Sequence, residues 1–195
     1  MSTPQRHPCG CRSGPRPGSS APPRGYEKPV RVEIVPARSA GEVDAFRRLC
    51  RDYAASLPCI TVSLTHQGFD REMDGLPGKY APPAGEILLA VLRRPDGSQD
   101  PIGGGALRPL DEAGVCEMKR MYVRPECRGI GAGMALARAL VEVARGRGYS
   151  LMKLDTDRTF DAAIAIYRKL GFRECPPYNT DPCNDTLWFD LPLRP

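Results

Sequence analysis

The chain has 195 residues, a hydrophobic fraction of 41%, a charged fraction of 26% and a formal net charge of +5. This length suits one domain with its own core, and the composition excludes a largely disordered or membrane-embedded protein. No apolar run approaches the roughly 20 residues of a membrane-spanning helix, and no secretory signal is evident. The basic residues are scattered among acidic ones, which argues against nucleic-acid binding. We therefore expect a cytoplasmic protein that does not bind membranes or nucleic acid.

The N-terminal segment differs in composition from the rest of the chain. Residues 1–28 are rich in Pro, Gly, Ser and Arg and contain almost nothing that would enter a core, which is typical of a disordered leader. The pattern then changes to an alternation of apolar and polar residues, as in a strand, at Val30, Val32 and Ile34. The sequence thus predicts a leader over residues 1–28 and one domain over residues 29–195.

Apolar periodicity predicts the elements that follow. A helix is expected from about Ala40 to Leu57 with Ser39 as its cap. A weaker helical stretch runs through residues 69–80 and is ended by Gly75 and Pro77. Three strand-like runs joined by short turns come next, and then two helices alternate with two strands. The strands are expected at 85–93, 101–110, 115–123, 151–156 and 187–193, and the helices at 134–148 and 160–172. Short links predict an antiparallel meander, so the fold class is α+β, with a mixed, mostly antiparallel sheet flanked by helices.

Cysteines and histidines restrict the chemistry. The eight cysteines are dispersed and form no CxxC pair, so we interpret them as free thiols and expect no metal. His7, Cys9 and Cys11 lie close together, but in the leader and without a second pair of ligands. The other histidine, His66, has no GxSxG or HExxH motif near it. Triad hydrolysis and polyhistidine metal catalysis are therefore disfavoured.

The sharpest local feature is the glycine-rich sequence RGIGAG at residues 128–133, between a strand ending at Val123 and an amphipathic helix. Glycines let the backbone approach a ligand closely, and a helix N-terminus offers unpaired N–H groups to a phosphate. Arg124 and Arg128 would add positive charge. A plain strand-to-helix turn is the alternative interpretation.

Two nucleotide-binding motifs fit this turn less well. A P-loop requires a Gly-Lys-Ser/Thr ending, which is missing. A dinucleotide fold would use Gly129 and Gly131 before the helix and Asp155 at the end of the next strand. However, residue 134 is Met, a meander precedes the turn, and only about 60 residues follow it, too few for the second half of that fold.

The RGIGAG sequence resembles the R/Q-x-x-G-x-G/A acyl-CoA motif of the GNAT superfamily through Arg128, Gly131 and Gly133. The preceding CEMKRMYV, the following helix with LMKLDT, and AAIAIYRKLGF are similar to that superfamily as well, so the resemblance covers roughly Val30 to Leu193. It implies an N-acetyltransferase that moves an acetyl group from acetyl-CoA to a primary amine of a small molecule or peptide. The amine would attack directly in a ternary complex. A catalytically silent acetyl-CoA-binding regulatory module is the functional alternative.

The resemblance also implies roles for particular residues. The backbone of Met121 and Val123 would pair with the pantetheine arm like an added strand. Tyr167 would protonate the departing thiolate, although its place on an apolar helix stripe equally suits a core tyrosine. Main-chain N–H groups would bind the pyrophosphate of acetyl-CoA at Arg128, Gly129, Ile130, Gly131, Ala132 and Gly133.

A base must also take a proton from the acceptor amine. Glu117 is the candidate, because strand alternation places it on one face with Lys119, Met121 and Val123. A surface pair between Glu117 and Lys119 is the alternative interpretation of this residue. Water that relays the proton to solvent is a third alternative.

The acceptor pocket is expected from residues 69–80 and from the CPPYNTDPCND segment at residues 175–185. Side chains there that would receive a cationic amine are Asp70, Glu72, Asp74, Tyr80 and Tyr178, and ordinary solvated surface is the alternative for each. The identity of the acceptor stays open, as does the choice between a monomer and a homodimer.

Overall fold

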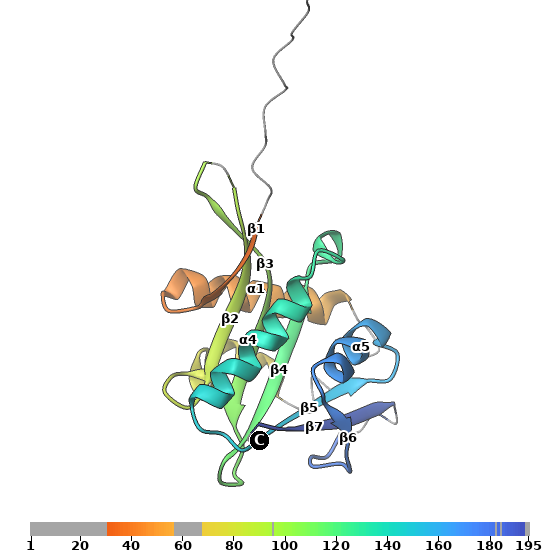
Figure 1. The fold of residues 1–195 in the computed structure, drawn as a ribbon. Coiled ribbons are helices and arrows are strands. Elements are labelled where there is room, and N and C mark those ends of the chain that lie inside the picture. The colour runs from red at the N-terminus through yellow and green to blue at the C-terminus, as the bar shows by residue number, and fades with distance from the viewer. Residues whose placement is uncertain (1–30, 57–67, 95, 182, 184, 194–195) are drawn as a thin grey trace, which may run out of the picture.

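The computed structural model describes residues 31–56, 68–94, 96–181, 183 and 185–193. Seven strands form one sheet in the order β1-β2-β3-β4-β5-β7-β6, with helices on both faces (Figure 1). This arrangement confirms the predicted α+β fold with a mixed, mostly antiparallel sheet. The predicted leader, both histidines and three of the cysteines lie outside the described residues. Within the described ranges, no helix has the length and apolar character needed to cross a membrane.

All neighbouring strands are antiparallel except β4 and β5, which are parallel. The predicted strands are present, and their ends lie within one or two residues of the predicted ends. The two-residue β6 was not predicted, because so short a segment shows no alternation of apolar and polar residues. The strands are β1 Arg31–Pro36, β2 Glu86–Arg93, β3 Gln99–Pro109, β4 Val115–Val123, β5 Leu151–Asp157, β6 Arg173–Glu174 and β7 Thr186–Pro192.

The helices lie where the apolar periodicity predicts them, with differences at their ends. Ser39 and Glu42 form a reciprocal cap at the start of the first helix, since each backbone N–H donates to the side chain of the other residue. The weaker helical stretch ends at Gly75 and Pro77, as predicted, and a separate short helical segment follows within residues 69–80. The helical segments are α1 Ala40–Ser56, α3 Phe69–Asp74, η2 Gly78–Tyr80, η3 Pro125–Cys127, α4 Ala132–Gly146 and α5 Asp161–Lys169.

The hydrophobic core has one cluster on each face of the sheet. Leu136 and Leu140 of α4 belong to the cluster that also contains residues of α5, and Phe46 of α1 belongs to the cluster on the other face. Consecutive glycines in β3 allow both layers to approach closely. A Cβ on Gly104 would lie 2.7 Å from the Phe46 ring, and a Cβ on Gly105 would lie 3.0 Å from a Leu140 methyl group.

The sheet opens between β4 and β5. Their register covers only Val115 to Glu117 of β4, whereas β5 pairs with β7 along its whole length. Further along β4 a bulge interrupts its pairing with β3, and Arg120, at a φ of 58°, lies at the bulge. A bulge bends its strand. In Figure 1 the two strands diverge beyond their paired ends, which leaves a gap in the sheet.

Candidate functional site

A cavity of about 120 Å³ lies at the gap between β4 and β5. Met118 and Tyr167 on its wall belong to the core cluster with α4 and α5, whereas Tyr53 and Phe160 pack against the cluster with α1. The cavity is therefore lined from both faces of the sheet. Its lining residues are Tyr53, Met118, Lys119, Arg120, Met121, Asp155, Thr156, Asp157, Phe160, Ala163, Tyr167, Asp181, Cys183 and Thr186.

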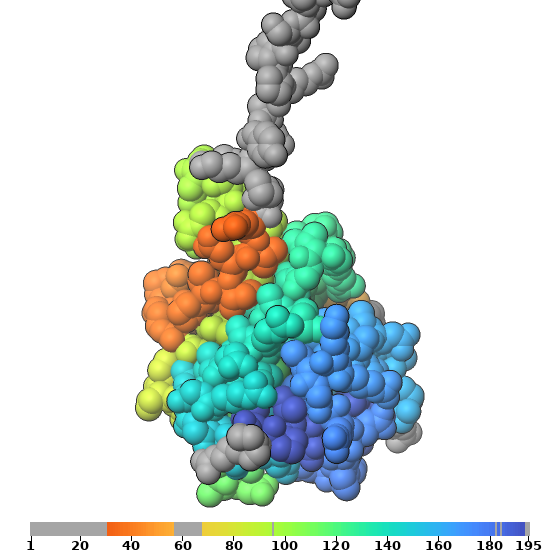
Figure 2. Space-filling model, viewed as in Figure 1, coloured from red at the N-terminus to blue at the C-terminus, as the bar shows by residue number. Residues whose placement is uncertain are grey.

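The RGIGAG loop leads directly into α4, beside α5 on the same face of the molecule (Figures 1 and 2). Gly129 and Gly131 have φ values of 83° and 89°, which glycine adopts readily and other residues rarely do. A Cβ at either position would meet nothing within 4 Å, so backbone conformation is what requires glycine there. At Gly133 the reason is packing, because its Cβ would lie 3.2 Å from Ile166 of α5.

The start of α4 has the properties of an anion site. The helix begins at Ala132, two residues before its predicted start, so the motif includes the first helical residues. Ala135 donates to the carbonyl of Gly131 at 3.0 Å, and the N–H groups just before Ala135 therefore precede the helical hydrogen bonds. Within the described residues no side chain caps this end, and its first turn has no acidic residue. These donors and the helix dipole favour a phosphate.

The backbone of β4 beyond the bulge faces the gap. Arg124 donates its N–H to Ile102 of β3 at 2.9 Å, so the preceding residue, Val123, directs its backbone groups away from β3. The Val123 carbonyl accepts instead from Nε of Arg128 at 3.2 Å. By the same alternation Met121 also directs its backbone groups towards the gap. Backbone groups directed in this way could pair with an extended ligand arm, as an added strand does.

The predicted grouping of side chains on β4 was wrong beyond the bulge. Met121 and Val123 pack against the core cluster on the α4 face, whereas Glu117 and Lys119 join polar partners away from that cluster. Strict alternation would place all four on one face. The bulge adds one residue at Arg120 and so shifts the alternation by one position. Side chains after the bulge therefore point to the opposite face from the one predicted.

Tyr167 belongs to the hydrophobic core and also lines the cavity. It is 6% exposed, and its ring centroid lies 5.9 Å from that of Phe172 and 6.4 Å from that of Phe189. Burial, with smaller contributions from Tyr53 and Asp155, raises the pKa of Tyr167 well above its ordinary value. The phenol therefore keeps its proton at neutral pH and is a hydrogen-bond donor.

Glu117 lies in a buried polar network rather than in a surface pair. Its side chain is 0% exposed and accepts from Nε of Arg108 at 2.5 Å and from the hydroxyl of Tyr178 at 2.8 Å. Nζ of Lys119 lies 3.5 Å from the same carboxylate. Glu117 is not among the described residues that line the cavity.

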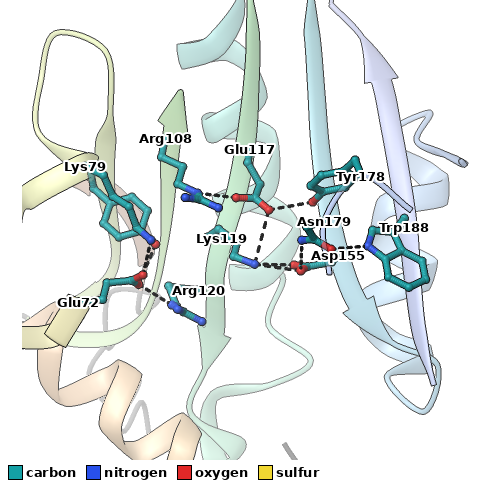
Figure 3. Close-up of polar contacts among 11 residues, drawn as sticks. Glu72, Lys79, Arg108, Glu117, Lys119, Arg120, Asp155, Tyr178, Asn179 and Trp188 are labelled. Atoms are coloured by element: carbon teal, nitrogen blue, oxygen red, sulfur yellow. Dashed lines mark hydrogen bonds and ion pairs between the residues drawn. The ribbon is translucent and has the colours of Figure 1, made fainter. Parts of the chain in front are cut away.

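The network continues across the gap (Figure 3). Nζ of Lys119 lies 2.8 and 3.0 Å from the two carboxylate oxygens of Asp155. Asp155 also accepts from Nδ2 of Asn179 at 3.0 Å, and Oδ1 of Asn179 accepts from the indole of Trp188 at 2.7 Å. Burial alone would raise the pKa of Asp155, but Lys119 and Asn179 outweigh it and the pKa is lowered. Sequence reasoning missed Asn179 and Trp188, because no local pattern brings them together with β4.

The expected acceptor residues do not line this cavity. Glu72 accepts from Arg120 at 2.7 Å and from the hydroxyl of Tyr80 at 2.8 Å, and Tyr178 is bound to Glu117. Asp70 and Asp74 are exposed. Of the two expected segments, residues 175–185 do contribute to the cavity, through Asp181 and Cys183.

No disulfide joins the described cysteines, which are Cys50, Cys116, Cys127, Cys175 and Cys183. Across the described residues, no group of three or more His, Cys, Asp or Glu side chains is arranged to hold a metal ion. The cluster of His7, Cys9 and Cys11 lies outside those residues.

Comparison with known proteins identifies the family. The model of the acetyltransferase (GNAT) family matches residues 53–172. An uncharacterized N-acetyltransferase of Schizosaccharomyces pombe is 33% identical over 166 residues, which are 85% of this chain and 98% of that protein. The IAA acetyltransferase of Azospirillum brasilense is 36% identical over 111 residues, which are 55% of this chain and 69% of that protein.

Solved structures agree in fold. A GNAT-family acetyltransferase of Staphylococcus aureus superposes with a TM-score of 0.67 at 16% identity, over 84% of this chain and 100% of that one. The PaiA N-acetyltransferase of Thermoplasma acidophilum, solved in complex with coenzyme A, gives a TM-score of 0.61 at 17% identity, over 83% and 99% of the two chains. At these identities the likeness shows the fold alone. Together with the sequence matches, it shows that this chain belongs to the GNAT acetyltransferase family and is an acetyl-CoA-dependent acyltransferase.

Proposed function

We propose that the protein transfers an acetyl group from acetyl-CoA to a primary amine of a small molecule or peptide, by direct attack in a ternary complex. The cavity at the gap between β4 and β5 carries this proposal, because it is lined from both faces of the sheet. A thioester approaching from the face of α4 and α5 and an amine approaching from the α1 face would meet there. The amine nitrogen bonds to the acetyl carbon, the carbon–sulfur bond breaks, and the thiolate leaves with the electron pair.

The cofactor side of this proposal rests on two backbone features. N–H groups of Arg128 to Gly133 hold the pyrophosphate, supported by the helix start and by the absence of an acidic residue from the first turn of α4. The guanidinium of Arg128, already directed to the edge of β4, adds positive charge. Backbone groups of Met121 and Val123 pair with the pantetheine arm.

Tyr167 is the proposed acid. Its phenol is protonated at neutral pH and lines the cavity beside the gap. Because burial raises its pKa, the phenol is a weaker acid than a thiol and assists by donating a hydrogen bond to the leaving sulfur. A neutral donor suits a leaving thiolate, which needs one proton as the carbon–sulfur bond breaks. Packing against Phe172 and Phe189 holds the ring in place. The core role and the proposed catalytic role are therefore compatible.

Two candidates remain for the proton acceptor, Glu117 and water. A direct base must come within hydrogen-bond distance of the amine, or reach it through one water. The Glu117 carboxylate is buried, outside the cavity lining, and already bound by Arg108 and Tyr178. These contacts favour water as the acceptor, with Glu117 maintaining the buried network.

The test is turnover by the full chain with acetyl-CoA and a panel of amines: alkyl monoamines, diamines, amino acids and peptides with free N-termini. Released coenzyme A is followed by the colour reaction of its thiol with a disulfide reagent, and the acetylated product is identified by mass. We expect at least one amine to accelerate thiol release strongly over the background. Stabilisation by coenzyme A without turnover of any amine would contradict the proposal and indicate a silent binding module.

A further inference from the structure

The loop of residues 175–181 is attached by consecutive side chains to both strands that border the gap. Tyr178 donates its hydroxyl to Glu117 of β4 at 2.8 Å. Asn179 donates its amide to Asp155 of β5 at 3.0 Å. The two strands are no longer paired at Asp155, so the loop is held on both sides of the opening. We refer to Tyr178 and Asn179 as the loop anchor (Figure 3).

The orientation of the Asn179 amide is fixed from two sides. Its nitrogen donates to Asp155, and its oxygen accepts from the indole N–H of Trp188 at 2.7 Å. Trp188 stands opposite Asp155 in the register of β5 and β7, so both partners belong to paired strands. A rotation of the amide would lose both bonds. Asn179 therefore joins the loop firmly to the edge of the gap.

The charges behind the anchor are balanced. Arg108 and Lys119 face Glu117 and Asp155, with Lys119 bridging β4 and β5 across the gap. The side chains of Lys119 and Asp155 are only 7% and 9% exposed. Displacement of any member of such a network would leave a buried charge or polar group without its partner, which is costly. The anchor is thus attached to side chains whose displacement is costly.

The residues after the anchor form part of the cavity wall. Asp181 and Cys183 line the cavity, whereas Tyr178 and Asn179 are absent from the described lining. The N–H of Cys183 donates to the Asp181 carboxylate at 2.9 Å, so these two residues are linked. A carboxylate on this wall attracts an ammonium group and repels the phosphates of coenzyme A. The wall therefore suits the acceptor rather than the cofactor.

We propose that Asn179 and Trp188 are positioning residues that determine the affinity for the acceptor amine by fixing the wall of Asp181 and Cys183. They touch neither reactant and act through the loop. This inference rests on the proposed function, since it assigns that wall to the acceptor side of the same cavity. It predicts that changes at Asn179 or Trp188 affect the acceptor and leave acetyl-CoA binding intact.

The first test is steady-state kinetics of Asn179→Ala with the amine that the panel shows to be turned over best. The acceptor KM is expected to rise about fivefold, and the acetyl-CoA KM to stay within about twofold of the wild-type value. Trp188→Phe keeps an aromatic ring but removes the donor, so it should raise the acceptor KM in the same direction by less. The matched control is Tyr149→Phe, which removes a hydroxyl that donates to the carbonyl of Ala84 at 2.9 Å, outside the cavity lining.

The second test needs no acceptor. Iodoacetamide alkylation of Cys183 is followed by peptide mass spectrometry in the full chain, with buried Cys50 as the internal reference. We expect the Cys183 rate to rise about threefold in Asn179→Ala and not in Tyr149→Phe, because a loosened wall exposes the thiol. An unchanged Cys183 rate, or a parallel rise of both KM values, would overturn the proposal. A faster Cys183 rate in a protein that acetylates no amine would support the anchor and contradict the proposed function instead.

Discussion

Gly133 in the first turn of α4 lies against Ile166 of α5, so closely that a Cβ on the glycine would be 3.2 Å from the Ile166 Cδ1. Tyr167 is the next residue of α5. The helix start that we propose to bind the pyrophosphate is therefore packed directly against the helix that carries the proposed acid. This contact sets the position of the proposed pyrophosphate site relative to the proposed acid.

Substitution of Gly131 tests the anion site. Gly131→Ala would force a side chain into a backbone with φ of 89°, at a cost of about 1 to 2 kcal/mol, so we expect the loop to rearrange and coenzyme A affinity to fall about tenfold. Calorimetric titration with coenzyme A measures the change. Gly148→Ala is the control, because Gly148 has φ of 80° and open space around it but lies beyond the other end of α4. Equal affinities for the two variants would contradict the assignment.

Substitution of Tyr167 tests the proposed acid. Tyr167→Phe keeps the packing against Phe172 and Phe189 but removes the hydroxyl, so kcat should fall by about a hundredfold while the Kd for coenzyme A changes less than about twofold. Rapid kinetics with saturating acetyl-CoA would measure the chemical step. A variant with the wild-type kcat would remove Tyr167 from the mechanism.

The two candidates for the proton acceptor, Glu117 and water, lead to different expected pH profiles for the variant Glu117→Gln. If water is the proton acceptor, Glu117→Gln keeps the acidic limb of the kcat/KM profile at its wild-type position, although it leaves Arg108 without its anion and destabilises the fold by about 3 kcal/mol. Denaturant unfolding and a pH profile measure the two effects. Glu33→Gln, which breaks an exposed pair with Arg93, serves as control and should change the stability little. Loss of the acidic limb in Glu117→Gln would restore Glu117 as the base.

The lowered pKa of the Glu72 carboxylate predicts how the stability of the fold depends on pH. Burial raises the pKa of Glu72, but Arg120 and Lys79 outweigh it and lower the value from 4.5 to about 2. A group with a lowered folded pKa stabilises the fold above its unfolded pKa, and this contribution is lost as pH falls through the folded value. The unfolding free energy should therefore decline between about pH 5 and pH 2, and Glu72→Gln should reduce that slope. Urea titrations over this range measure it, and an unaltered slope in the variant would contradict the interpretation.

The sequence predicts those features that depend on neighbours along the chain. Periodicity was sufficient for α1, α4 and the meander, and the glycines of RGIGAG identified the turn before α4. Features that depend on long-range contacts were not predictable. The bulge at Arg120 has no local signal, since a positive φ is unusual for arginine, and it reversed the predicted facing of Met121. Likewise, Asp155 and Asn179 are 24 residues apart in the sequence and come together only in the folded structure.

The most direct measurement is a crystal structure of the full chain with coenzyme A. The account predicts the pyrophosphate on the N–H groups of the RGIGAG loop, and the thiol end in the gap between β4 and β5 beside Tyr167. A pyrophosphate bound away from the start of α4, or a thiol outside that gap, would contradict it.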